Sequence, residues 1–321
     1  MAFAWGPGLP LARLAARART LATLRAFFAS RGVLEVDTPL LSSHASTEPT
    51  LANLAVELPG SRAGRGYLRT SPESAMKRLL AAGSGDIYQL GPVFRGDELG
   101  RRHLREFTLL EWYRVGFDHL RLMDEIDALL RAVGYAAPVT RLAYGELFAE
   151  HFGVSPHGLN TAALAALVAA QGMALAADER DDRALLFDCL YATVLEPALA
   201  TRGAVLLYDY PCELRAYARL SGGSPPVAER FELVVDGLEL ANGYHEITEA
   251  AEQAACFAAE NALRARRGLP HVALDSRWLD ALRASMPRAA GVALGVERLL
   301  MVLEGATRID QVAAFADELP G

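Results

Sequence analysis

The segment from Gly91 to Arg114 constrains the fold of this 321-residue chain more than any other. An apolar strand ends at Phe94-Arg95, a charged loop follows between Gly96 and Gly100, and a second strand resumes at Glu106. Two strands joined by a glycine-bounded loop predict an antiparallel hairpin. An arginine at its base can hold a carboxylate or phosphate through two parallel hydrogen bonds, which lysine cannot do. An isolated motif of this kind is more often an ordinary hairpin with a solvated loop, so its companions decide.

Composition excludes several classes of protein. No run of eighteen apolar residues occurs, which excludes an ordinary transmembrane helix, so we expect no contact with a membrane. The net charge of −7, from 32 basic and 39 acidic residues, provides no basic stripe for sequence-independent binding of nucleic acid. The three cysteines are scattered, odd in number and without metal-site spacing, as expected of reduced thiols in the cytoplasm. We therefore predict a cytoplasmic protein.

Hydrophobic periodicity predicts a single α+β domain over residues 1–321, with an Ala- and Leu-rich helical insertion at about 138–200. Predicted helices cover 11–29, 119–133, 249–266, 277–284 and 296–303, and a further helix begins at Ser71-Pro72-Glu73. Predicted strands cover 33–39, 67–70, 87–94, 106–112, 205–208 and 291–295, with a hairpin at 229–241. Lys77 is the only lysine, which we interpret as a consequence of the Arg-rich composition.

The hairpin turn at Asp236-Gly237 permits a sharper inference. Asp-Gly between alternating strands is a strong two-residue turn signal, and it places Val234 opposite Glu239. Glu232 and Glu239 then project from the same face of the hairpin. Two carboxylates aimed together repel each other, so a cation would stabilise them, and oxygen ligands beside phosphate suit Mg²⁺. The alternative is that both side chains line a solvated sheet face.

Two further motifs complete the set. E-L-A-N-G-Y-H-E-I runs from Glu239 to Ile247, and G-V-A-L-G-V-E-R-L runs from Gly291 to Leu299. In the order S-P-E, F-R-x-D/E, E-W-Y, E-x-x-N-G and G-x-E-R, the motifs resemble the catalytic core of lysyl-tRNA synthetases. They resemble still more closely the stand-alone paralogues of those enzymes, the elongation factor P–lysine lysyltransferases. The resemblance extends from about Arg13 to the last helix.

The resemblance implies a class II aminoacyl-tRNA synthetase-like domain, an antiparallel sheet flanked by helices, which forms a homodimer through residues 33–39. The first motif ends at Pro39, which leaves no room before it for an anticodon-binding domain, so no recognition of a tRNA anticodon is expected. The implied reaction uses ATP and Mg²⁺ to activate (R)-β-lysine, or lysine, as the adenylate. The acyl group then passes to the ε-amine of a lysine on elongation factor P.

Other functions stay open at this point. A truncated lysyl-tRNA synthetase and an amide-forming enzyme like asparagine synthetase A are the enzymatic alternatives. A non-enzymatic paralogue that senses an amino acid is the alternative outside catalysis, although the intact Arg95, Glu232, Glu239 and Arg298 disfavour it.

Residue by residue, the resemblance implies catalytic roles for Arg95, Glu239 and Arg298, and Mg²⁺ ligation by Glu232 and Glu239. Glu73 would take the amino group next to the substrate carboxylate, and Glu246 with Tyr113 the side-chain ammonium. The remainder of the implied amino-acid pocket is Ser71, Pro72, Glu111, Asn242 and Ala293. The implied ATP contacts are Arg95, Gly96, Asp97, His103, Leu104, Phe107, Glu239, Leu240, Gly295 and Arg298.

Three departures from the family pattern concern the nucleotide loop and the pocket. Asp97 stands where the family usually has Glu, and Leu104-Arg105 replaces the usual Asn-Pro, which removes an amide that often contacts ATP. Ala293 replaces the glycine of lysyl-tRNA synthetases and matches the lysyltransferases. Outside the motif roles, His245 is interpreted as a surface histidine.

Overall fold

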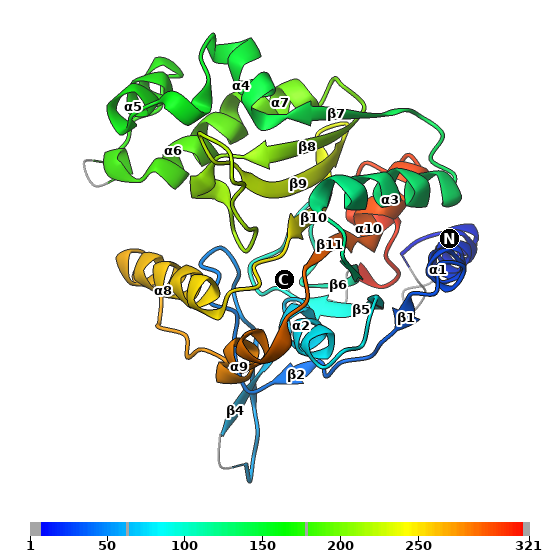
Figure 1. Cartoon of the computed structure of the whole chain (residues 1–321). Coiled ribbons are helices and arrows are strands. Elements are labelled where there is room, and N and C mark those ends of the chain that lie inside the picture. Colours follow the sequence, from blue (N-terminus) through cyan, green and yellow to red (C-terminus); the bar gives the residue numbers. More distant parts are fainter. Residues whose placement is uncertain (1–7, 62–63, 177–178, 317–321) are drawn as a thin grey trace.

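The structure is a computed structural model that describes residues 8–61, 64–176 and 179–316. Its centre is a sheet with the strand order β1-β5-β6-β11-β10-β9-β8-β7 (Figure 1). The edge pairs β1–β5 and β7–β8 are parallel, and the strands between them pair antiparallel. In chain order the strands are β1 Leu34–Glu35, β5 Ile87–Phe94, β6 Glu106–Val115, β7 Val139–Ala143, β8 Ala204–Tyr210, β9 Ala228–Val235, β10 Leu238–His245 and β11 Ala289–Gly295.

A smaller antiparallel sheet has the order β2-β4-β3, with β2 Leu41–Ser42, β3 Ala55–Glu57 and β4 Arg65–Leu68. The α-helices are α1 Leu11–Ala29, α2 Glu73–Ala81, α3 His119–Ala132, α4 Tyr144–Phe152, α5 Thr161–Ala170, α6 Arg183–Leu190, α7 Glu196–Leu199, α8 Ala250–Arg266, α9 Ser276–Ser285 and α10 Val296–Leu303. Short 3₁₀ or π segments occur at Pro156–Gly158, Glu179–Asp181, Tyr191–Leu195, Cys212–Leu214 and Ile309–Gln311. Across the described ranges, every helix is too short or too polar to cross a membrane.

One face of the central sheet is covered by α1, α3 and α10, which pack in a single apolar core with the strands beneath them (Figure 1). The Asp118 side chain accepts a hydrogen bond from the Arg121 backbone and starts α3. Apolar residues then recur every three or four positions, at Leu122, Ile126 and Leu129, and all are fully buried. Each contributes about 1.5–3 kcal/mol of transfer free energy.

The opposite face is only partly covered. Helices α4 to α6 pack over β8 and β9, where Leu207 and Val234 are buried. The same face of β6, β11 and β10 instead lines an open cleft. The helical cover therefore stops where the cleft begins, and the middle strands provide its floor.

Most predicted elements are present, and the differences follow from how the strands pair. The predicted strand at 33–39 pairs only at Leu34–Glu35. The segment 138–200 is not wholly helical, because it opens with β7, whose parallel partner β8 lies about sixty residues further along. The turn at Asp236-Gly237 has the predicted pairing of Val234 with Glu239, but a bulge at Leu240 then shifts the register. Asn242, rather than Ala241, therefore stands opposite Glu232.

Gly243 on β10 gives a test of this packing. A Cβ atom there would lie 2.4 Å from Phe231 Cζ and 2.9 Å from Val292 Cβ, and the Phe231 ring is fully buried. We expect Gly243→Ala to destabilise the fold by about 1–3 kcal/mol through overpacking, measured by urea unfolding. Gly158→Ala is the matched control, since its Cβ would meet nothing within 4 Å. Equal midpoints for the two variants would contradict this account.

Candidate active site

The cleft encloses about 530 Å³, and rows of paired residues across the sheet form its floor. Glu111 on β6 pairs with Ala293 on β11, which pairs with Asn242 on β10, which pairs with Glu232 on β9. Directly paired residues project from the same face of a sheet. The four side chains therefore form one polar row, interrupted by the methyl group of Ala293.

A second row lies one pleat further along the same strands. Tyr113 pairs with Gly291, Gly291 with Tyr244, and Tyr244 with Arg230. A Cβ atom on Gly291 would lie 2.3 Å from the Tyr113 ring and 2.6 Å from Glu246 Oε1. Glycine at this position therefore leaves the space that the Tyr113 ring and the Glu246 carboxylate occupy.

A buried cation, Lys77, lies behind residues that line the cleft, although its presence was interpreted from the sequence as a consequence of composition. Its Nζ lies 2.6 Å from Glu73 Oε1 and 2.6 Å from Glu246 Oε2, and its side chain is 1% exposed. The aromatic rings of Trp278 and Tyr217 lie 5.1 and 5.6 Å from the same ammonium. The two carboxylates that the resemblance assigned to substrate amines thus already share an internal cation.

Glu73 and Glu246 contact this single ammonium, and a third carboxyl group, Glu111, interacts with its charge at longer range. Glu111 accepts hydrogen bonds from the Tyr113 hydroxyl at 2.7 Å and the Ser71 hydroxyl at 2.8 Å. Burial, followed by the charge of Glu73, raises the pKa of Glu111 to about 7. Burial also raises the pKa of Glu246, while the carboxylates of Glu246 and Glu73 outweigh burial and raise the pKa of Lys77. When all three acids are ionised, the group carries two uncompensated negative charges.

The other end of the cleft is cationic. Arg95 donates to Glu98 at 2.9 Å, and its guanidinium lies 5.1 Å from the centre of the Phe107 ring. Arg298 donates to the Glu239 backbone carbonyl at 2.8 Å and lies 2.6 Å from His103 Nε2. Burial and then the charge of Arg298 lower the pKa of His103, so its imidazole is neutral and accepts from the guanidinium.

Glu232 and Glu239 face the same cleft, as the hairpin predicted. Arg230 and Asn242 donate to Glu232, whereas Glu239 has 46% of its side chain open to solvent in the cleft. Lost hydration, followed by the charge of Glu232, raises the pKa of Glu239 to about 7. Arg230 pairs with Glu232, and Arg298 lies 3.9 Å from Glu239. Two neighbouring carboxylates of this kind fit a further cation with a preference for oxygen ligands.

The cleft brings together sixteen of the nineteen residues that the resemblance implied. The exceptions are Pro72, Gly96 and Asp97. The Gly96 backbone donates to the Ala52 carbonyl at 2.8 Å, and the Asp97 carboxylate accepts from the Ala52 backbone at 3.3 Å. These two residues therefore hold the nucleotide loop against the neighbouring segment instead of facing the cleft.

Sequence reasoning missed several lining residues. Arg230, Glu98 and Trp278 line the cleft, and nothing in the motifs indicated them. Lys77 had an available signal, because it lies four residues after Glu73 on a predicted helix, the spacing of an ion pair. The expectation that His245 lies at the surface is wrong. It is 3% exposed and lies on the sheet face away from the cleft.

Replacing Lys77 tests the buried ion cluster. Lys77→Met keeps the chain volume but leaves Glu246 buried without its cation, so we expect a loss of about 3–5 kcal/mol in the free energy of unfolding. Arg78→Met removes a half-buried charge from the next position of the same helix and should cost less than about 1 kcal/mol. Chemical denaturation of both variants measures the free energy of unfolding. A Lys77→Met protein as stable as Arg78→Met would refute the role of the cluster.

Comparisons with known proteins identify the family of this chain. The sequence model of the tRNA synthetases class II (D, K and N) matches residues 11–318. The chain is 44% identical to the elongation factor P–(R)-β-lysine ligase of Vibrio cholerae over 97% of both proteins. It is 44% identical to that of Edwardsiella ictaluri over 97% of both, and 43% identical to that of Pasteurella multocida over 98% of both. The chain therefore belongs to the class II tRNA synthetases of the D, K and N type, in the branch that contains the elongation factor P–(R)-β-lysine ligases.

Proposed function

We propose that this protein uses ATP to activate (R)-β-lysine, or lysine, and transfers the acyl group to a lysine ε-amine of elongation factor P. The observation that carries the proposal is the charge of the pocket. Within the group of Glu73, Glu111, Glu246 and Lys77, three carboxylates face one ammonium, so the ionised group lacks two positive charges. A diamino acid carries two ammonium groups. The names of the relatives, elongation factor P–(R)-β-lysine ligases, contain the same substrate and the same acceptor.

The polarity of the cleft sets the orientation of such a substrate. Its ammonium groups would lie against the carboxylates beside Lys77, and its carboxylate would extend toward Arg95 at the cationic end. The Ala293 methyl group stands on the floor between Glu111 and Asn242. A change of one methyl group in a packed site alters shape selectivity, and we propose that this one favours the β-isomer.

Activation then follows from the positions of the charges. An oxygen of the substrate carboxylate attacks the α-phosphorus of ATP, and the bond to pyrophosphate breaks. Arg95 and Arg298 would neutralise charge on the phosphates, with Phe107 offering a ring surface to the base. Glu232 and Glu239 would hold Mg²⁺, which screens phosphate charge when bound.

Transfer needs no strong base from the protein. A neutral ε-amine of elongation factor P attacks the acyl carbon of the adenylate, AMP leaves, and an amide forms as the nitrogen loses a proton. Holding the two reactants together supplies the rate advantage of an intramolecular reaction. We place this reaction in the cytoplasm, which suits three free cysteines.

We also propose that two copies pair through the edge that carries β1. Leu34, Leu40 and Leu41 are 55%, 39% and 42% exposed there, beside the outermost strand of the sheet. Unpaired strand edges and exposed leucines are the surfaces that a second chain covers.

The choice of acceptor is the direct test of this function. We expect the protein, incubated with ATP, Mg²⁺ and (R)-β-lysine, to add one lysyl group to elongation factor P, measured by intact-protein mass spectrometry. Unfractionated tRNA in place of the factor should stay almost uncharged. Efficient charging of tRNA with an unmodified factor would instead identify a truncated synthetase.

The Arg95→Ala variant assigns the reaction to this cleft. It should lower amino-acid-dependent pyrophosphate exchange by about 10²–10³-fold, because a preorganised contact to developing charge is lost. Arg19→Ala, on the exposed surface of α1, should exchange pyrophosphate at the wild-type rate. Exchange that is equal in all three proteins would place the activation chemistry elsewhere.

Titration of the pocket predicts the pH dependence. A cationic substrate binds the ionised form of Glu111, whose pKa is about 7 in the free protein. The kcat/KM for (R)-β-lysine at saturating ATP should therefore fall as the pH drops below about 7, since that ratio reports ionisation of the free enzyme. Glu111→Gln should lower kcat/KM and weaken the inflection, since the pKa of Glu246 beside it is also raised to about 7. A wild-type profile flat from pH 6 to 8 would contradict this account.

A further inference from the structure

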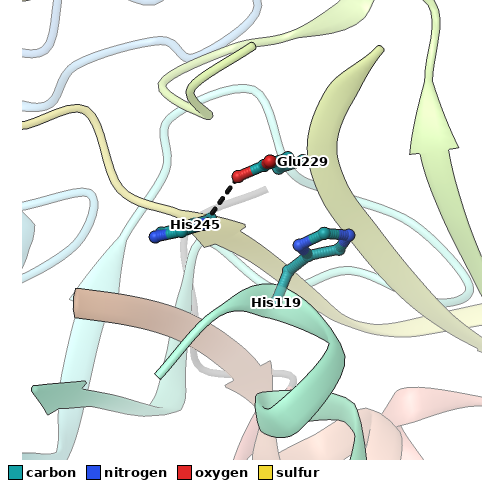
Figure 2. A group of neighbouring side chains, drawn as sticks. All are labelled: His119, Glu229 and His245. Carbon is teal, nitrogen blue, oxygen red and sulfur yellow. Dashed lines mark ion pairs between the residues drawn. The ribbon is translucent and has the colours of Figure 1, made fainter. Parts of the chain in front are cut away.

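A second cluster of chemistry-bearing side chains lies on the sheet face away from the cleft. His119 at the start of α3, Glu229 near the start of β9 and His245 at the end of β10 converge there (Figure 2). One donor atom from each residue lies within 4.8 Å of the others. His119 and His245 are 6% and 3% exposed. The substrate pocket makes no use of these three groups.

His119 is held in the orientation of a metal ligand. Its Nε2 lies 3.0 Å from Asp209 Oδ1, and its buried Nδ1 has no hydrogen-bond partner. When Nε2 carries the ring proton and donates to Asp209, Nδ1 presents a lone pair to the cluster. A carboxylate behind a histidine is the usual second partner of a metal-binding imidazole.

The backbone at Asp209 deviates from the regular strand where it presents that carboxylate. Asp209 lies at the bulge between Tyr208 and Tyr210 and has a φ of 56°, in the left-handed region. Bulges redirect side chains, and strained residues concentrate at functional sites. The fold thus departs from the strand to place Asp209 beside His119.

The charges around the cluster leave room for a cation. His245 Nδ1 lies 2.6 Å from Glu229 Oε2, and Arg219 Nε lies 3.3 Å from the same oxygen. The carboxylates of Asp209 and Glu229 and the guanidinium of Arg219 sum to a single negative charge. The Arg219 side chain is 37% exposed, and the Glu229 side chain is 17% exposed.

We propose that His119, His245 and Glu229 bind a divalent transition-metal ion of the Zn²⁺ class, with Asp209 orienting His119. Two imidazoles and one carboxylate are a three-ligand set that Zn²⁺ accepts, with a fourth position for water. Bonds of about 2.0–2.1 Å set ligand atoms about 3.4 Å apart. Small side-chain rotations would therefore separate His245 Nδ1 from Glu229 Oε2, now 2.6 Å apart, and bring the more distant donor atoms of the cluster closer. Mg²⁺ prefers oxygen ligands and is excluded by the two imidazoles.

Such an ion would join three elements behind the substrate pocket. It would fix the start of α3 to β9 and to the end of β10, and His245 directly precedes Glu246 on the pocket floor. The ion therefore has a structural role, and it is separate from the Mg²⁺ that Glu232 and Glu239 would hold.

Cobalt titration tests the site in the full-length, untagged protein. After removal of bound metal by a chelator, Co²⁺ is added in the presence of excess Mg²⁺, which saturates oxygen-only sites. We expect one equivalent to bind, with the visible absorption of four- or five-coordinate Co²⁺ and displacement by Zn²⁺. Intense sulfur-to-cobalt charge-transfer bands would assign the ion to cysteines and overturn the proposal, as would the absence of saturable binding.

Two variants locate the ion, and a third serves as a control. His119→Asn should abolish stoichiometric binding. Asp209→Asn keeps a residue that tolerates the left-handed backbone and should weaken Co²⁺ binding by about 10–100-fold. His157→Ala removes a half-buried histidine outside the cluster and should bind as the wild type does. If His119→Asn fails to fold, Asp209→Asn decides, and wild-type affinity in that variant refutes the site.

Discussion

The ion cluster of Lys77, Glu73 and Glu246 is the interaction on which the rest of the pocket depends. A buried ammonium is tolerated only when carboxylates compensate it, and each partner here comes from a different part of the chain. Glu73 and Lys77 lie one turn apart on α2, Glu246 follows β10, and the ring of Trp278 comes from α9. The cluster thus fixes how α2 and α9 sit against the end of the sheet, and it also sets the charge that a substrate meets.

Sheet register provides the second level of organisation. Since paired residues share a face, the order of strands places a carboxylate, a methyl group, an amide and a second carboxylate in one line from Glu111 to Glu232. The bulge at Leu240 shifts that line by one residue and brings Asn242 to Glu232. A small backbone irregularity therefore decides which polar groups a ligand finds on the floor.

Local sequence signals were enough for many elements of this fold. The periodicity of α1 and α10 and the Asp-Gly turn between β9 and β10 are contained within short windows, and the structure has them where predicted. The strand β7 depends on a parallel partner far along the chain, which no local window contains. Lys77 was missed for a related reason. Its importance comes from Glu246, which the fold brings to it from 169 positions away. His245 was misjudged for the same reason. It is buried because its side chain lies on the face of β10 that is turned toward α3.

The burial of Lys77 has a consequence for the chemistry of the enzyme itself. Aminoacyl adenylates acylate any free amine that stays close to them, and guanidinium groups are not nucleophiles at neutral pH. Among 32 basic residues this chain has one side-chain amine, and that amine is enclosed and kept protonated by two carboxylates. The protein around the adenylate thus offers it no accessible side-chain amine with which to form an amide. A lysine delivered by another protein therefore meets no competing lysine side chain on the surface of this chain, whatever the origin of the Arg-rich composition.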